Sequence, residues 1–323
     1  MVRISTAFRQ LALASCCSLA MAAVAQTGGG TSKIVVPTPA GGSADLTART
    51  LARGLQDLLP DNLIVENRPG ASMQIGFQAV MHAAKDGKTL LVTPNGPVVV
   101  SPHLQKLPYD PLKDLAPVAM IARVPAGIAV PANSPIRNVQ DFIKEAKRKP
   151  GGLTYSVSGL GIHMHLAGEL LSIATGAPMR AIPYKGTNPA ATAIAAGDVD
   201  AGISDMATLI PHEKAGRLRI IAVTDSARYA ALPEVPTVAE QGVPGYAAEA
   251  WMGTFAPAGT PAAIVAELSL AVEKVLDQRE SREALAGIGL EPFFLNSEAM
   301  GTFIRDDSKK WADLIKQANI KIE

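Results

Sequence analysis

The sequence predicts an α/β protein of two lobes that share a hinge. Strand-like and helix-like runs alternate along the chain, and after a break near Asn138 the same alternation begins again. Strands that alternate with helices indicate a largely parallel sheet in each half. Three helices near the C-terminus follow without strands of their own, so we expect them to return to the first lobe. Their return requires two crossings, near Pro125–Pro131 and Tyr246–Ala256, and such a pair of short strands makes a hinge.

The first half contains five strand-like runs and two helical patterns. The pattern from Ser43 to Leu59 places Ala44, Leu51 and Leu58 on one helical face. The second helical pattern covers Ser72–Ala84. The expected strands are Lys33–Pro37, Asn62–Glu66, Thr89–Thr93, Leu115–Ile121 and Gly127–Pro131.

The second half repeats this alternation, and we assign residues 126–250 to a second lobe. Its expected helices are Val139–Arg148, His163–Thr175, Asn188–Ala196 and Thr208–Ala215. Its expected strands are Thr154–Val157, Met179–Pro183, Val199–Ser204 and Leu218–Thr224.

The last part of the chain begins with a loop rich in Pro and Gly, Pro233–Gly245, and a strand, Trp251–Ala256. The three helices that follow are expected at Ala262–Leu276, Ser281–Gly287 and Ser297–Ala318. Because no strand is expected among them, we assign residues 26–125 and 251–323 together to the first lobe.

The N-terminus has the pattern of a secretory signal peptide, residues 1–25. Arg3 and Arg9 precede the apolar run Leu11–Val24, which is too short to span a bilayer, and Ala23-Val24-Ala25 is a small-x-small cleavage site. We therefore expect an exported protein. The segment before Cys16 also resembles a lipoprotein cleavage box, so lipidation at Cys16 remains an alternative.

Removal of the signal peptide would change the composition of the chain. Cys16 and Cys17 are the only cysteines, so the mature protein would have no disulfide. The chain has 30 basic and 29 acidic residues, and loss of Arg3 and Arg9 leaves 28 against 29, a net charge of −1. A nearly neutral chain without basic runs argues against nucleic acid as a partner.

Ligands of open parallel sheets bind beyond the carboxyl ends of strands, where helices begin. The turns at these places are rich in Gly, Ser, Thr and Asn and poor in catalytic carboxylates. Free backbone N–H groups at helix starts favour anions. Such turns in both lobes predict a clamp for a small carboxylate. The turns are Thr38–Asp45, Asn67–Ser72, Thr93–Pro97, Ser156–His165, Tyr184–Asn188 and Asp205–Met206.

Four polar residues in these turns have two interpretations each. Asp45 either complements the dipole of the helix that it begins or accepts a hydrogen bond from a ligand or a water molecule. Arg68 and Lys185 are either ligand-binding cations or solvated charges at the rim of the site. Asn95 follows a strand end, where we expect ligand contacts.

No motif in the sequence supports catalysis, a cofactor or a metal. His163 and His165 would point to different faces of a helix, and no third ligand is near, so we expect no metal there. We expect His165 to brace the loop Gly159–Gly161 by a local hydrogen bond. The sequence contains neither a G-x-S-x-G nor an H-E-x-x-H motif.

Several segments together closely resemble the Bug, or TctC-type, receptors of tripartite tricarboxylate transporters. They include PAGGSADLTARTLARGL, VENRPGA, PYKGTNPAATAIAAGDVDAGISD and APAGTP. The resemblance covers nearly all of the mature chain. It implies the two-lobe type II periplasmic-binding-protein fold with two hinge strands. It also implies a monomer that binds a small carboxylate and passes it to a two-component membrane permease without catalysis.

The resemblance also implies a set of ligand-binding residues. In the family, the second-lobe loop commonly carries hydroxyl residues at two positions where this sequence has Val157 and Ile162. We therefore expect these two side chains to meet an apolar or aromatic part of the ligand, unless they belong to the core. The other implied residues are Ala40, Gly41, Gly42, Asp45, Asn95, Ser158, Gly159, Gly161, Tyr184, Lys185, Gly186 and Asp205.

Two other functions remain open at this point. A sensor that docks on a signalling ectodomain would need the same ligand-driven closure as a transport receptor. An exported hydrolase is disfavoured because no nucleophile and base are evident from their spacing.

Overall fold

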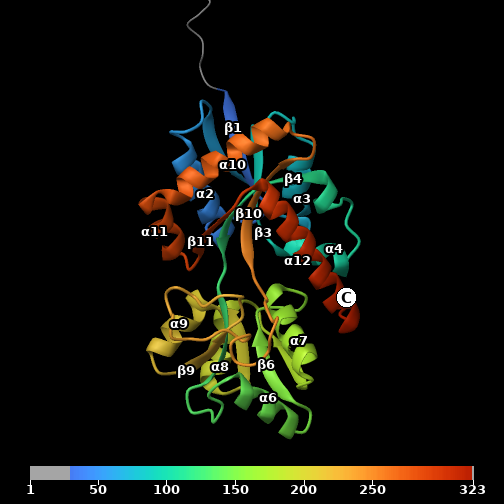
Figure 1. The fold of residues 1–323 in the computed structure, drawn as a ribbon, viewed down its shortest axis with the longest axis vertical. Helices are drawn as coiled ribbons and strands as arrows, with labels where there is room; N and C mark the ends of the chain where they lie inside the picture. Colours follow the sequence, from blue (N-terminus) through green and yellow to red (C-terminus); the bar gives the residue numbers. More distant parts are fainter. Residues whose placement is uncertain (1–29, 322–323) are drawn as a thin grey trace, which may run out of the picture.

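The computed structural model describes residues 30–321, and these residues form two lobes, each built around one β-sheet. Figure 1 shows the lobes one above the other, joined by two extended crossings. The predicted signal peptide and Cys16 lie outside the described residues. Among residues 30–321, no helix combines the length and apolar character that a membrane span requires.

The sheet of the first lobe has six strands in the order β11-β4-β10-β3-β1-β2. The strands β1, β2 and β3 are parallel, whereas β10 is antiparallel to β3 and β4, and β11 is antiparallel to β4. The largely parallel arrangement that we predicted therefore holds for β1–β3 only. The strands are β1 Thr31–Val36, β2 Asn62–Asn67, β3 Thr89–Pro94, β4 Leu115–Arg123, β10 Trp251–Pro257 and β11 Glu291–Leu295.

The sheet of the second lobe has five strands in the order β7-β6-β8-β5-β9. The strands β6, β7 and β8 are parallel, and β5 runs antiparallel to β8 and β9. The antiparallel ladders of β10 and β5 arise because each of these strands enters from the other lobe and runs against its neighbours. The strands are β5 Ala126–Pro131, β6 Leu153–Val157, β7 Met179–Pro183, β8 Ala201–Asp205 and β9 Leu218–Val223.

Helices cover both faces of each sheet. In the first lobe, α2 (Ser43–Leu55), α10 (Ala262–Asp277) and α11 (Arg279–Gly287) share a core on one face. On the other face, α3 (Gln74–Met81) and α12 (Ser297–Gln317) share a core that continues into the second lobe.

The second lobe is covered in the same way. Helices α6 (Val139–Arg148) and α7 (His163–Thr175) pack on the continuous core, whereas α8 (Thr187–Ala196) and α9 (Met206–Lys214) pack on the opposite face. Short helical turns complete the chain at η1 Ala71–Met73, η2 Gly96–Val100, α4 Ser101–Leu104 and α5 Pro111–Asp114.

Period-two patterning explains why β1 and β3 lie inside the first lobe. Ile34 and Val36 belong to the core under α2, whereas Val35 between them belongs to the core under α3.

The sequence analysis did not predict strand β11, and the prediction that no strand lies among the C-terminal helices is wrong. Five residues with a proline among them give a weak pattern, and pairing with the edge of β4 decides their conformation.

Backbone hydrogen bonds tie the two crossings to each other. The N–H of Val124, in the first crossing, donates to the carbonyl of Ala250, in the second, at 2.8 Å. The N–H of Ala248 donates to the carbonyl of Thr224, the residue after β9, at 2.9 Å. The crossings therefore form one narrow connection between the lobes.

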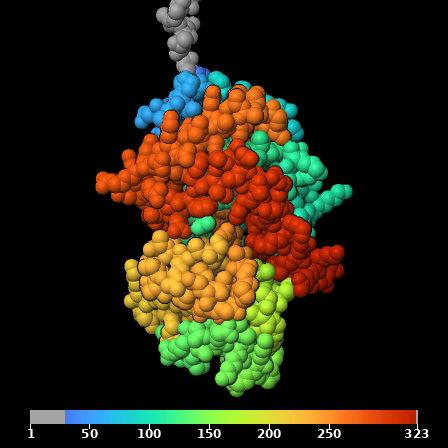
Figure 2. All heavy atoms as spheres, in the orientation of Figure 1, coloured from blue at the N-terminus to red at the C-terminus, as the bar shows by residue number. Residues whose placement is uncertain are grey.

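Helix α12 bridges the lobes beside this connection. Its Trp311 ring lies edge-on to the ring of His163, the first residue of α7, with 5.6 Å between the ring centres. Lys310 of α12 donates to the carbonyl of Ala247 in the second crossing at 3.1 Å. Figure 2 shows α12 in dark red, reaching from the upper lobe down the side of the lower one.

The two tryptophans give a test of the polar bond that fixes the start of β10. Both indoles are fully buried, and Trp251 donates from Nε1 to Asp307 Oδ2 at 3.0 Å, whereas the Nε1 of Trp311 has no partner among the described residues. We expect Trp251→Phe to lower the free energy of unfolding by about 1–3 kcal/mol more than Trp311→Phe. Denaturant unfolding of both variants measures the difference, and equal losses would show that the bond to Asp307 contributes nothing.

Candidate functional site

The register of the first sheet gathers the predicted turns of the first lobe at one edge. Val36 at the end of β1 pairs with Asn67 at the end of β2, and β3 runs parallel beside them. Strand β10 enters at the same edge, because Met252 near its start pairs with Pro94 at the end of β3. The carboxyl ends of β1, β2 and β3 therefore face the crossings.

The second sheet presents its turns to the crossings in the same way. Ala126 at the start of β5 pairs with Asp205 at the end of β8, and Val157 at the end of β6 pairs with Pro183 at the end of β7. The six turns therefore lie on two facing edges, one from each lobe. We call these the facing edges.

Contacts between the lobes lie on both sides of the crossings. Gly289, just before β11, packs against Ala207 of α9 so closely that a side chain at position 289 would overlap it. On the other face of the molecule, Trp311 of α12 meets His163 of α7.

Asp45 is fully engaged by the turn that contains it. Its side chain is 2% exposed, and its carboxylate accepts hydrogen bonds from the Gly41 N–H at 2.9 Å, Arg49 Nε at 3.0 Å and Asn67 Nδ2 at 2.9 Å. Burial opposes ionisation, but the hydrogen bonds from these donors lower the pKa of Asp45 below its usual value. The carboxylate therefore holds Gly41 in its left-handed conformation, with φ of +86°.

The turn after β2 carries backbone strain. Gly70 has φ of 124°, and the three residues after it, Ala71, Ser72 and Met73, also have positive φ, at 45°, 51° and 75°. Residues with side chains rarely adopt this conformation, and strain of this kind is concentrated at functional sites. Arg68 in the same turn is paired with Glu66 at 2.6 Å, so the structure favours the interpretation of a charge at the rim.

Asn95 ties the turn after β3 to the second crossing. Its backbone N–H donates to the carbonyl of Trp251 at 3.0 Å, and its side-chain Nδ2 donates to the carbonyl of Glu249 at 3.3 Å. The side chain is only 3% exposed. Asn95 therefore positions the crossing strand at the edge where the ligand is expected.

The loop before α7 confirms one prediction and decides between two alternatives for Val157. The N–H of Gly161 donates to Nδ1 of His165 at 3.0 Å, so His165 braces this loop as expected. Val157 has no exposed surface and packs in the continuous core, so its side chain is a core residue and offers nothing to a ligand in this conformation. Ile162, in contrast, is 39% exposed. Ser158 and Gly159 are half-buried beside it.

The two remaining turns of the second lobe lie next to this loop. The N–H of Tyr184 donates to the carbonyl of Val157 at 2.8 Å, which joins the turn after β7 to the end of β6. Lys185 is exposed, and Gly186 precedes α8 with φ of 113°. Asp205 precedes α9, and burial raises the pKa of its carboxyl to about 6.

The sequence analysis did not identify a polar cluster at the crossings, formed by Asp225, Ser226 and Glu249. Asp225 follows β9 and is 3% exposed, and burial together with the nearby charge of Glu249 raises its pKa well above the usual value. Glu249 Oε1 accepts hydrogen bonds from both the N–H and the Oγ of Ser226. The signal was present, because Asp225 follows a strand end just as the other turn residues do.

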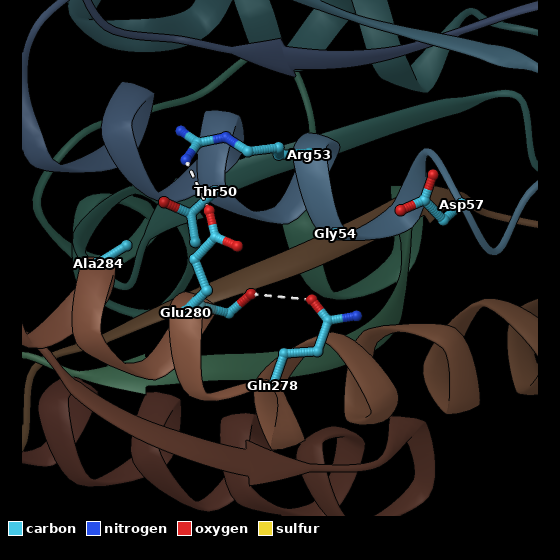
Figure 3. A pocket seen from close by; sticks show the side chains of 8 residues that line it. Thr50, Arg53, Gly54, Asp57, Gln278, Glu280 and Ala284 are labelled. Carbon is cyan, nitrogen blue, oxygen red and sulfur yellow. Dashed lines mark hydrogen bonds and ion pairs between the residues drawn. The ribbon is translucent and has the colours of Figure 1, made fainter.

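The groove in Figure 3 lies between α2 and α11, away from the facing edges. Its volume is about 110 Å³, and Arg53 and Glu280 lie 3.6 Å apart at its side. It is formed by the C-terminal half of α2, whereas the predicted turn lies before the N-terminus of that helix. Within residues 30–321, no three His, Cys, Asp or Glu side chains are grouped so that they could hold a metal.

The raised pKa of Asp205 predicts that the stability of the fold depends on pH. A free Asp titrates near 3.8, so as the pH rises from about 4 to 6 the unfolded state loses this proton while the folded state keeps it, and the fold is destabilised. We expect Asp205→Asn to remove this part of the loss, so its melting temperature should exceed that of the wild type at pH 7 but not at pH 4.

Asp200 provides a control of opposite sign. Burial opposes its ionisation, but hydrogen bonds from Lys149 and Thr154 lower its pKa below the usual value. Asp200→Asn should therefore lower the melting temperature at pH 7 and have less effect near pH 3. Thermal unfolding at three pH values tests both variants, and shifts of the same sign at pH 7 would contradict this assignment.

Comparison with known proteins identifies the family. The model of the TctC family, described as tripartite tricarboxylate transporter family receptor, matches residues 47–320. Protein BugT of Bordetella pertussis is 35% identical over 293 residues, covering 90% of both chains. A ligand-free TctC solute-binding protein from Polaromonas has a TM-score of 0.83 at 28% identity and covers 89% of this chain and 98% of its own. R. palustris Rpa4515 with adipate has a TM-score of 0.73 at 34% identity, with coverage of 90% and 98%. This chain therefore belongs to the TctC family of solute-binding receptors.

Proposed function

We propose that this protein is a periplasmic receptor that closes its two lobes on a small organic carboxylate and delivers it, as a monomer, to a two-component membrane permease. The observation that carries the proposal is the meeting of glycine-rich turns on the two facing edges. Each of these turns leads into a helix, so its N–H groups and the helix dipole both favour an anion. The structure of the related Rpa4515 with adipate supports this ligand class.

In this proposal, backbone groups bind the carboxylate and buried side chains position them. Asp45 accepts a hydrogen bond from Gly41 and Asn95 donates one to the crossing, so both act on the ligand through the turns that they hold. Ile162 remains a ligand contact, whereas Val157 does not. The direct contacts would come from Ala40, Gly41, Gly42, Ser158, Gly159, Gly161, Ile162, Tyr184, Lys185, Gly186 and Asp205.

A difference between the two related structures supports closure on the ligand. Rpa4515 is the closer of the two in sequence, yet this chain is more similar in structure to the ligand-free protein. We infer that the two related proteins differ in the arrangement of their lobes, which would produce this order. The narrow connection at Val124 and Ala250 is where such a movement would occur.

A thermal-shift panel of mono- and dicarboxylates tests the ligand class. A carboxylate present at about 100 times its dissociation constant should stabilise the fold by roughly 2.7 kcal/mol. Zinc is the control and should produce no shift. A panel in which every carboxylate is silent while zinc stabilises the protein would refute the proposed function.

A further inference from the structure

We propose that Ile75 of the first lobe and Leu160 and Ile162 of the second form an apolar wall that selects carboxylates with a long aliphatic chain. The proposal rests on the function given above and specifies the ligand class. It assigns the specificity for chain length to three side chains on the facing edges.

The three side chains are exposed where polar residues would be expected. Ile75 is 48% exposed, Leu160 54% and Ile162 39%. Ile75 lies in the first turn of α3, and the other two lie in the turn between β6 and α7. Large apolar side chains gathered in both halves of a binding region are informative, whereas single ones elsewhere on a surface are not.

Helices α3 and α7 lie on the same side of the crossings. Phe77 of α3 and Leu166 of α7 belong to the one core that continues through both lobes. Figure 1 shows α3 above and α7 below on the same side of the crossings. Ile75, in the helix that follows the turn after β2, and Ile162, in the turn after β6, therefore lie at the two facing edges.

Each isoleucine also lies over a glycine of its own turn. A Cβ atom at Gly70 would come within 2.7 Å of the Ile75 Cδ1, and one at Gly159 would be 3.8 Å from the Ile162 Cδ1. The isoleucine side chains thus fold back over the turns. Each lobe presents a bare backbone next to an apolar surface, which suits a ligand whose carboxylate is followed by methylene groups.

Closure on such a ligand would bury methylene groups against the wall. Burial of one methylene is expected to strengthen binding about fourfold. A short diacid with a charge at each end would leave the wall uncovered or bring a charge against it, which weakens binding. Affinity should therefore rise with chain length until the chain fills the space between the lobes.

Isothermal titration with linear dicarboxylates, from succinate through adipate to suberate, tests the inference. For the wild type we expect affinity to rise about fourfold per methylene over part of the series. In the variants Ile75→Ser and Leu160→Ser, each added methylene should increase the affinity by less than about twofold, while the affinity for succinate changes little. The matched control is Leu270→Ser, since Leu270 is 57% exposed on α10, away from the facing edges. It should behave as the wild type does.

Three results would overturn the inference. Equal affinity of the wild type along the series would show that no apolar wall acts on the ligand. Equal weakening of all diacids in the two variants would assign these side chains to closure or to folding. If no diacid binds while another carboxylate stabilises the protein, the inferred preference for long aliphatic diacids is wrong. The proposed function would then still stand.

Discussion

The pairing of β10 with both β3 and β4 is the constraint on which the site depends. Because β10 enters from the second lobe and runs antiparallel to both neighbours, it must begin where they end. The carboxyl ends of the first sheet are thereby fixed at the crossings. Strand β5 imposes the same condition on the second sheet, since its start pairs with the end of β8. The facing edges follow from these two ladders.

Different groups position the backbone of the site and remain free to contact the ligand. Asp45 and Asn95, which the sequence analysis considered as ligand contacts, hold the backbone instead: Asp45 holds Gly41 and Asn95 holds the second crossing. His165 holds Gly161, as predicted. The exposed side chains that remain on the facing edges include Lys185 and the apolar Ile75, Leu160 and Ile162. In a site of this kind, substitutions of the apolar side chains can change which ligand is preferred while the groups that bind the carboxylate stay the same.

Most of the fold could be predicted from the sequence because its signals are local. Helices α6 and α7 have the predicted bounds, since clear apolar periodicity and breaking residues such as Gly176 define them. The sequence could not predict β11, whose conformation depends on the edge of β4. It also could not place Val157, because a strand residue faces the core or the surface according to a register that only the assembled sheet defines.

Amide hydrogen exchange with and without saturating adipate tests the central claim most directly. If the facing edges enclose the ligand together, backbone amides within residues 39–46 and 158–163 should gain protection at the same ligand concentration. Residues 278–284, beside the groove between α2 and α11, should not change. Protection confined to one lobe, or found at residues 278–284 instead, would contradict the account.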